Sequence, residues 1–367
     1  MNEKVREPLF HIVKRPAIEW YKSWAIRVAA VVLALVLAGF VTLALTGLNP
    51  LMVYATIVDG AVGTARRCWA LAQKTAMLLC IALALTPAFR MRFWNTGAEG
   101  QVLAGGMAAA AVMLKCADLV PNGLLFILMF LSAVVAGAVW GVIPAIFKAK
   151  WGTNETLFTL MMNYIAIQIV GFFVLEWSVP KGSGQIGVIN QKTQAGWIPP
   201  LFGQAYLINI LIVVLITILI YIYIRYTKHG YEIDVVGESE RTARYIGIDV
   251  KKVIIRTMVL SGAICGITGF LLVAGSDHTI TKDTAGGNGF TAIMVCWLAK
   301  FNPIWMILTS LLICFLQKGA GEIATMFQLN LSFADIITGI IIFFIVGSEF
   351  FINYRIIWRK KEKEDQK

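Results

Sequence analysis

Polar side chains gather in two short glycine-rich segments of an otherwise apolar sequence. Residues 95–101 contain Glu99 and residues 284–290 contain Asn288, each at the third position of a GxxG pattern. A charged or amide side chain beside long apolar stretches is costly unless it has a partner or a water-filled cavity. Such residues could line the path of a polar solute. Glu99 could instead cap the backbone N–H groups at the start of its own helix, where the helix dipole favours a carboxylate.

Other reactive residue types are poorly placed for chemistry. No two cysteines have CxxC spacing, and most of them lie inside or beside apolar runs, where packing is the expected role: Cys68, Cys80, Cys265, Cys296 and Cys314. The three histidines are scattered and form no HExxH pair. No GxxxxGK[ST] phosphate loop occurs, so the chain lacks the usual means of binding ATP. We expect no catalytic residue, no metal site and no cofactor in this chain.

The elements that must position these residues are membrane helices. Of 367 residues, 58% are hydrophobic and only 14% are charged, whereas about a quarter are charged in soluble proteins. A bilayer core requires roughly 20 apolar residues per helix, and the eighth of the apolar stretches is short for that role. About ten stretches are present, near residues 25–46, 68–89, 101–117, 122–147, 158–177, 205–224, 254–274, 289–299, 303–320 and 333–353. The sequence thus predicts an all-α polytopic membrane protein with about ten transmembrane helices, and it excludes an ordinary soluble enzyme.

The positive charges follow this topology. The net charge of +11 would suggest nucleic acid in a soluble chain. With ten spans and a cytoplasmic N-terminus, however, 24 Lys and Arg residues fall on the cytoplasmic side and seven on the outside, as the positive-inside rule predicts. We therefore expect a bacterial cytoplasmic membrane protein with both termini in the cytoplasm and no nucleic-acid partner. The predicted organisation is a basic N-terminal segment (1–24), a membrane domain (25–353) and a basic tail (354–367).

The two glycine-rich segments indicate an inverted repeat. By this topology, the first segment precedes an outward-going span and the second an inward-going one. The repeat halves would cover about residues 67–177 and 254–353. Matching interruptions in two inverted halves are typical of a translocation pathway, although small residues also serve plain helix packing. Asn163, near the start of the fifth span, is expected to hydrogen-bond across helices.

Two hydrophilic segments are long enough to have separate roles. Residues 178–204 contain Gly and Pro punctuation that favours an ordered external loop over a span. Residues 225–253 would face the cytoplasm and include a short helix with Glu240 and Arg244 at i,i+4, ended by Gly247. That helix is either a docking element for a partner protein or a solvated linker.

Five motifs occur in order over roughly residues 50–350. Residues 94–101 match an FNIGAEGQ-like segment, with Trp94 and Thr96 in place of Phe and Ile, and residues 154–166 match an NExxxTLMxNYIA-like segment. Residues 234–248 match the cytoplasmic pattern RAVGENxxAARYxGI, with Asp234 for Arg and Ser239 for Asn. The remaining matches are Ser261, Gly262, Ala263, Gly266, Gly269, Gly289, Phe290, Ala292 and Ile293. Together these motifs resemble those of the permease subunits of ABC importers for simple sugars and nucleosides, relatives of the ribose and branched-chain amino acid permeases.

The resemblance implies the fold of a type II ABC importer permease with an inverted repeat and a division of labour among several chains. A cytoplasmic ABC ATPase, which carries the ATP and Mg, docks on the loop. A second permease subunit completes the pathway, favoured as a heterodimer because the chain resembles the larger permease of nucleoside importers, and an extracellular or periplasmic binding protein delivers a nucleoside or a sugar. The implied coupling residues are Gly237, Glu238, Arg241, Ala243, Arg244, Tyr245 and Gly247. The implied pathway residues are Asn95, Glu99, Gln101, Asn163, Asn288 and Phe290.

Two other classes of protein remain as alternatives. An ion-coupled secondary transporter of a small polar solute would also fit an inverted repeat, and it would use membrane carboxylates as ion relays. It leaves the cytoplasmic helix without a role. A membrane-embedded enzyme would require a cluster of His, Asp or Cys at one membrane face, which the sequence does not provide.

Overall fold

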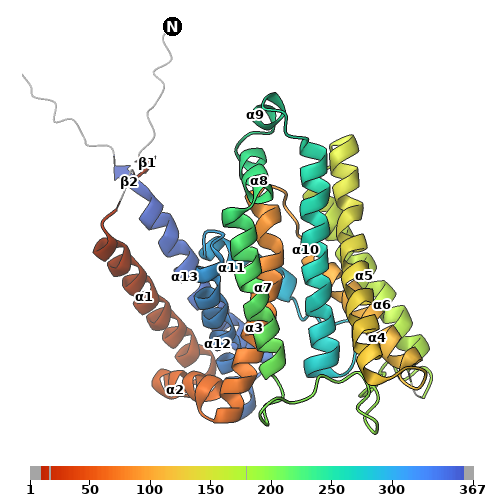
Figure 1. The fold of residues 1–367 in the computed structure, drawn as a ribbon. Helices are drawn as coiled ribbons and strands as arrows, with labels where there is room; N and C mark the ends of the chain where they lie inside the picture. The colour runs from red at the N-terminus through yellow and green to blue at the C-terminus, as the bar shows by residue number, and fades with distance from the viewer. Residues whose placement is uncertain (1–9, 16–17, 179, 359–367) are drawn as a thin grey trace, which may run out of the picture. The chain divides into compact units, whose positions relative to one another are not determined.

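The described part of the protein is mainly α-helical (Figure 1). The computed structural model describes residues 10–15, 18–178 and 180–358. Two short strands pair antiparallel, β1 (Phe10–Lys14) with β2 (Tyr354–Trp358). The helices are α1 (Trp20–Thr46), α2 (Pro50–Val62), α3 (Ala65–Arg90), α4 (Ala98–Cys116), α5 (Asn122–Trp151), α6 (Glu155–Trp177), α7 (Leu207–Tyr226), α8 (Lys228–Glu238), α9 (Glu240–Tyr245), α10 (Val250–Leu272) with a π-helical turn η1 (Val273–Asp277), α11 (Asn288–Leu298), α12 (Pro303–Met326) and α13 (Leu331–Asn353).

Eight helices in the described part of the chain are long and apolar enough to cross a membrane, which confirms the all-α membrane class. They are α1, α3, α5, α6, α7, α10 with η1, α12 and α13. The expected count of ten is not confirmed, because the stretches at α4 and α11 do not qualify. α4 begins with polar residues and is rich in Ala and Gly, while α11 has only 11 residues.

The chain forms two compact units, and the first contains residues 1–63 and 315–367. In this unit α1 packs on α13, and Arg27 donates to Glu349 at 2.7 Å between them. Sequence reasoning missed α2, although Asn49 accepts the Leu51 N–H and Pro50 occupies the first turn, both helix-start signals. It also missed the β1–β2 pair and placed the start of the first helix at residue 25, whereas α1 begins at Trp20. Parts of the predicted terminal segments, residues 1–9, 16–17 and 359–367, lie outside the described residues.

The second unit contains residues 64–314, and its centre is a close contact of α4, α5 and α10. Small residues make this contact possible. A Cβ on Gly266 of α10 would lie 2.2 Å from the Ala133 carbonyl oxygen of α5, and one on Gly262 would lie 2.3 Å from the Gly137 oxygen. A Cβ on Gly105 of α4 would lie 2.5 Å from the Gly266 Cα. The backbones of these helices are therefore in direct contact, and this core fixes the position of α4 against α5 and α10.

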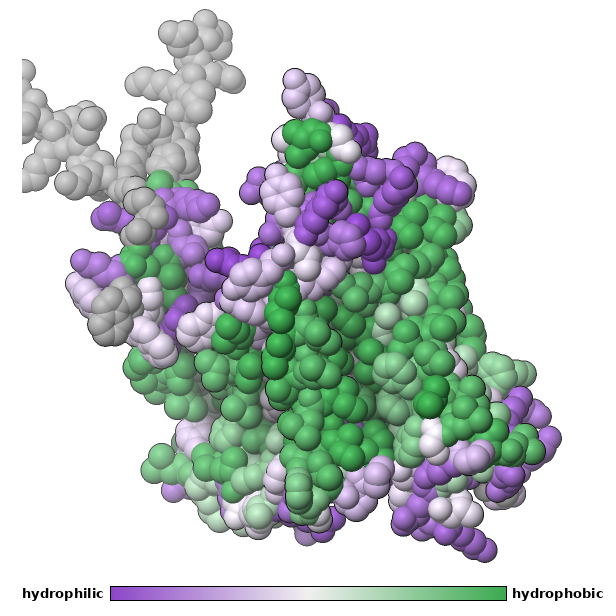
Figure 2. Space-filling view, viewed as in Figure 1, coloured by the Kyte–Doolittle hydropathy of each residue, from purple (hydrophilic) through white to green (hydrophobic). Residues whose placement is uncertain are grey.

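The basic segments expected on one side of the membrane lie at one end of this unit. Arg92, Lys148 and Glu238 line one cavity there, and Arg90, Arg225 and Lys300 line a neighbouring one. Figure 2 shows hydrophilic residues gathered over α8 and α9 and hydrophobic residues covering α7 and α10 below them. The unit thus presents an apolar belt with a polar, basic end.

The segment after α6 forms an ordered cap at the opposite end, as its Gly and Pro punctuation predicts. Asn190 donates its side-chain amide to the Met113 carbonyl at 3.0 Å, and Gly196 N–H donates to the Asn122 side chain at 2.9 Å. The indole of Trp197 stacks on the imidazole of His278 with ring centroids 3.8 Å apart. Burial lowers the pKa of His278 below its ordinary value of 6.5. The cap therefore ties together the ends of α4, α5 and α10.

Candidate functional site

The two glycine-rich segments, far apart in the sequence, meet inside the second unit. The loop 91–97 follows α3 and leads into α4, while the loop 278–287 follows η1 and leads into α11. Glu99 joins them. Its two carboxylate oxygens accept the backbone N–H groups of Gly287 and Gly289, both at 2.7 Å. A Cβ on Gly289 would lie 2.5 Å from the Glu99 nitrogen, so glycine is required for this approach.

Glu99 therefore caps a helix, but not its own. Gly287 and Gly289 flank the first residue of α11, so the carboxylate binds the N-terminal N–H groups of that helix. The positive end of the helix dipole and the two charge-assisted bonds stabilise a carboxylate that is only 6% exposed. The two interpretations that the sequence left open were pathway lining and capping of α4. The structure shows a third arrangement, a bond between the two interrupted segments.

Asn95 and Gln101 connect the loop 91–97 to the first turn of α4. The Gln101 side-chain amide donates to the Asn95 Oδ1 at 3.2 Å, and the Asn95 amide donates to the Ser261 Oγ of α10 at 3.2 Å. Gly97 N–H also donates to the Asn95 Oδ1 at 3.0 Å. All three side chains are buried. The polar residues that the sequence singled out here form a connected hydrogen-bond network instead of a set of separate contacts to solvent.

Asn163 of α6 confirms the expected bond between helices. Its Oδ1 accepts the Gly100 N–H at 2.8 Å, and its Nδ2 donates to the Thr96 carbonyl at 2.8 Å. Thr159, one turn earlier on α6, accepts the Thr96 N–H at 3.2 Å. Thr159 lies within the motif at residues 154–166, but the sequence predicted no role for it. Its spacing of one helical turn from Asn163 was the available signal.

Asn288 and Phe290 lie beside this network. Asn288 begins α11 and donates its backbone N–H to the Ala285 carbonyl at 3.0 Å, and Phe290 is 45% exposed on the surface of α11. Two further exposed aromatic residues lie at the basic end. Trp94 of the loop 91–97 and Trp297 in the last turn of α11 stack with ring centroids 5.5 Å apart. The sequence assigned Trp297 no role.

The segment predicted to dock a partner is a helical projection built from α8 and α9. Gly237 packs directly on α3, since a Cβ there would lie 2.0 Å from the carbonyl oxygen of Arg90, the last residue of that helix. Ala243 of α9 is fully buried in a cluster with Val236, Val250 and Met258. The inner side of the projection is therefore anchored to α3 and α10.

The outer side of this projection is exposed. Tyr245 is 93% exposed at the end of α9, and Ile246 beside it is also exposed. The predicted helix is confirmed: Ser239 caps it, Glu240 pairs with Arg244 at 3.2 Å, and Gly247 follows with φ of +86°. An exposed aromatic and an exposed aliphatic side chain on a rigid base are typical of a protein interaction site.

Ion pairs set the position of α8. Asp234 accepts from Arg90 at 2.9 Å, and Glu232 accepts from Arg256 of α10 at 2.8 Å. Partial burial raises the pKa of Asp234, and the Arg90 guanidinium opposes that rise. Asp234, which replaces the Arg of the motif, is thus the acidic partner of the residue on which Gly237 packs. Glu238 and Arg92 line one small cavity beside α8.

Metal-binding clusters are not found in the described residues, where no three His, Cys, Asp or Glu side chains lie together. The site offers no nucleophile beside a base. The site contains one buried carboxylate and a set of side-chain amides that hold the two glycine-rich segments together. A separate feature is the anchored α8–α9 projection at the end of the unit.

Comparison with known proteins agrees with this geometry. The family model for the branched-chain amino acid transport system permease component matches residues 69–346. A nucleoside ABC transporter permease of Lactococcus lactis is 30% identical over 326 residues, covering 86% of this chain and 88% of the relative. A guanosine ABC transporter permease of Bacillus subtilis is 27% identical, covering 87% and 92%. A glucose ABC transporter permease of Haloferax volcanii is 28% identical, covering 89% and 88%.

These relatives are membrane transport components, not enzymes. The match spans most of the chain and includes both interrupted segments, α8 and α9. The chain therefore belongs to the family of permease components of the branched-chain amino acid transport system.

Proposed function

We propose that the chain is the permease subunit of an ABC importer that moves nucleosides across the bacterial cytoplasmic membrane. A separate ABC ATPase supplies the energy, an external binding protein delivers the solute, and a second, related permease completes the pathway as a heterodimer. The observation that carries this proposal is the α8–α9 projection, which exposes Tyr245 while its base packs on the end of α3, immediately before the loop that leads to Glu99. The relatives named for nucleoside and guanosine transport favour the solute class.

The proposed orientation places the α8–α9 end in the cytoplasm. The basic segments gathered at this end support it, since Lys and Arg remain on the cytoplasmic side. As a separate part of the proposal, both chain termini are assigned to the cytoplasm, as the charge distribution of the sequence predicts. Cysteine labelling of intact cells tests this: a cysteine introduced at Tyr245 should react only after permeabilisation, and one introduced at Phe202, in the opposite cap, should react in intact cells. The reverse pattern would exclude this orientation.

The coupling proposal assigns the ATPase contact to the exposed side of α9. Movement of α9 would pass through Gly237 to Arg90 and so to the loop 91–97, as a rigid-body shift. Tyr245→Ala should leave folding unchanged, because its side chain is exposed, and should lower both ATPase copurification and uptake. Phe202→Ala, an equally exposed aromatic at the other end, is the matched control. Equal losses in the two variants would contradict the assignment.

Charged residues of α9 provide a second test of the coupling proposal. Reversing Arg241 and Arg244 together with Gly247→Pro should uncouple ATP hydrolysis from uptake. The Pro forces a negative φ where the chain has φ of +86°. Unchanged coupling in this variant would place the contact elsewhere.

The pathway proposal concerns the meeting point of the two interrupted segments. Half-helix ends of this kind hold polar solutes in many transporters. Asn288 and Phe290 are the test residues, because they lie at the edge of the buried network and not within it. Asn288→Ala and Phe290→Ala should change uptake while the complex still assembles. Normal uptake in both variants would leave these two residues with a packing role only.

The solute and the energy source can be tested in one assay. Uptake with the matching binding protein should favour labelled guanosine and cytidine over ribose and glucose, and it should stop without ATP. A preference for a sugar would support the assignment as an importer but contradict the proposed solute class. Uptake that continues without ATP, or without the ATPase subunit, would instead support an ion-coupled secondary transporter.

A further inference from the structure

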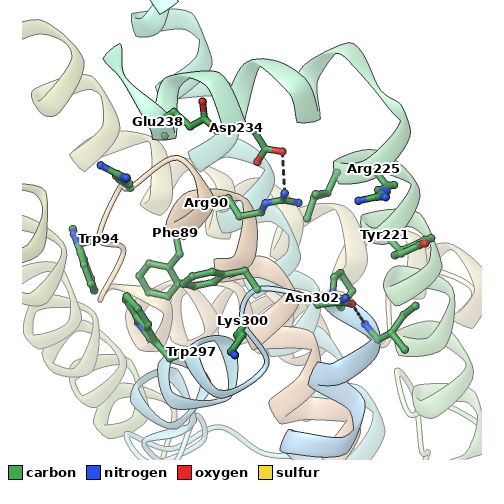
Figure 3. Close-up of a pocket in the computed structure, with 16 residues that line it drawn as sticks. Phe89, Arg90, Trp94, Tyr221, Arg225, Asp234, Glu238, Trp297, Lys300 and Asn302 are labelled. Atoms are coloured by element: carbon green, nitrogen blue, oxygen red, sulfur yellow. Dashed lines mark hydrogen bonds and ion pairs between the residues drawn. The ribbon is translucent and has the colours of Figure 1, made fainter. Parts of the chain in front are cut away.

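A basic pocket lies at the α8–α9 end of the second unit and is not part of the network around Glu99. It has a volume of about 830 Å³ and is bounded by the ends of α3 and α7, by α8, and by the turn between α11 and α12. Figure 3 shows Arg90 from α3 paired with Asp234 of α8, with Arg225 and Tyr221 of α7 on one side and Lys300 on the other. Membrane-spanning helices end around this pocket, so it lies at the depth of lipid headgroups.

The charge of this pocket suits an anion. Its basic side chains are those of Arg90, Arg92, Arg225 and Lys300, against the two carboxylates of Asp234 and Glu238. Arg90 and Asp234 are engaged with each other at 2.9 Å. Four basic side chains against two carboxylates give the lining a net charge of +2, and the basic side chains come from α3, the loop after it, α7 and the turn between α11 and α12. A phosphate group can accept several such donors at once.

An apolar groove continues from the same pocket. It has a volume of about 470 Å³ and runs between α3, α7 and α12, along the segments that cross the membrane. Val214 and Ile218 of α7 face Ile307 and Leu311 of α12 across it. Tyr221 and Ile304 line both the groove and the basic pocket, which joins the two spaces. One ligand can therefore occupy both.

We propose that this composite space binds an anionic phospholipid, with its phosphate group among the basic side chains and an acyl chain in the groove of α7 and α12. A soluble phosphate fits only the pocket and gains nothing from the apolar groove. A zwitterionic lipid fits the groove but lacks the net negative charge that the pocket favours. An anionic lipid satisfies both parts, and basic pockets between membrane helices are known headgroup sites. The proposal does not depend on which solute is transported.

The test is native mass spectrometry of the full-length chain within its purified complex, with phosphatidylglycerol and phosphatidylcholine of equal chain length added. We expect preferential retention of phosphatidylglycerol. Each basic residue near an anionic lipid strengthens binding roughly fivefold, so Arg225→Gln with Lys300→Gln should weaken this retention about 25-fold. Lys251→Gln with Lys252→Gln removes equal charge from the same end, outside the pocket and the groove, and should change it little.

A second pair of variants tests the groove. Val214→Trp fills the groove and should lower retention of phosphatidylglycerol, whereas Leu215→Trp, an exposed neighbour outside its lining, should not. Equal retention of the two lipids by the wild-type protein would overturn the proposal. So would full competition by inorganic phosphate, which would reduce the site to an anion pocket. Retention by the isolated chain but not by the complex would show that a second permease covers the groove, and would also overturn it.

Discussion

Replacing Glu99 by Gln tests the contact that joins the two interrupted segments. The carboxylate accepts two N–H groups at 2.7 Å from the start of α11. A glutamine has nearly the same shape but only one carbonyl oxygen. Its amide group would face one of the two glycine N–H groups, so that one bond is lost and a buried donor has no acceptor. The other bond changes from a charge-assisted bond to a neutral one.

The size of the effect follows from these two changes. A hydrogen bond to a charged group contributes about 1.5–3 kcal/mol and a neutral one about 1 kcal/mol. The lower cost of burying a neutral amide offsets part of the loss. We therefore expect Glu99→Gln to lower the free energy of unfolding by about 2–4 kcal/mol, which corresponds to a decrease in Tm of roughly 5–15 °C for a unit of this size.

Thermal unfolding of the purified complex, followed by intrinsic fluorescence, measures this difference. Asp249→Asn is the matched control. It makes the same change from carboxylate to amide, also at a helix start, where Asp249 accepts the Lys252 N–H at 3.2 Å. Asparagine caps a helix as well as aspartate does, so its Tm should stay within about 2 °C. If the Tm of Glu99→Gln falls no further than the Tm of the control variant, the bond between the two segments does not contribute this stability.

Three further predictions concern other contacts. Gly266→Ala should destabilise the protein by about 1–3 kcal/mol because its Cβ would meet a carbonyl oxygen of α5 at 2.2 Å, while Gly321→Ala, with open space around it, should stabilise it by about 0.5–1 kcal/mol in thermal unfolding. Asn163→Ala should cost about 2–4 kcal/mol in the same measurement, since the buried Gly100 N–H and the partly buried Thr96 carbonyl lose their partner. Because the pKa of His278 is lowered in the folded protein, its contribution to stability is present above pH 6.5 and is lost as the pH falls below that value. Hydrogen exchange in the cap, corrected for intrinsic rates, should therefore accelerate between pH 7.5 and pH 5.5, and His278→Gln should remove that dependence.

Local patterns in the sequence predicted the elements that depend on local physics. Apolar stretches of sufficient length located the eight spanning helices, and the short eighth stretch corresponds to α11. Ser239, Glu240 and Gly247 carry the cap, the i,i+4 pair and the positive φ of α9, all within one short segment. These residues alone were sufficient to predict the short helix α9.

Contacts between distant segments could not be predicted in the same way. Glu99 and Gly287 are 188 positions apart, and nothing near either residue indicates that they bond. The sequence left two alternatives for Glu99, lining of the pathway and capping of its own helix, and neither predicts a bond to Gly287. The β1–β2 pair could not be predicted for the same reason, because each strand is only five residues long and its partner lies at the other end of the chain.

The buried contacts give the proposed coupling a definite route. Gly237 has no space for a side chain against the Arg90 carbonyl, so α8 and the end of α3 must move together or separate. Arg90 is followed by the loop 91–97, which leads directly to Glu99, and Asn95 of that loop accepts hydrogen bonds from Gly97 and from Gln101 in the first turn of α4. Packed cores do not deform continuously. Under the coupling proposal, a displacement at α9 would therefore reach the start of α11 through these close backbone contacts and buried hydrogen bonds.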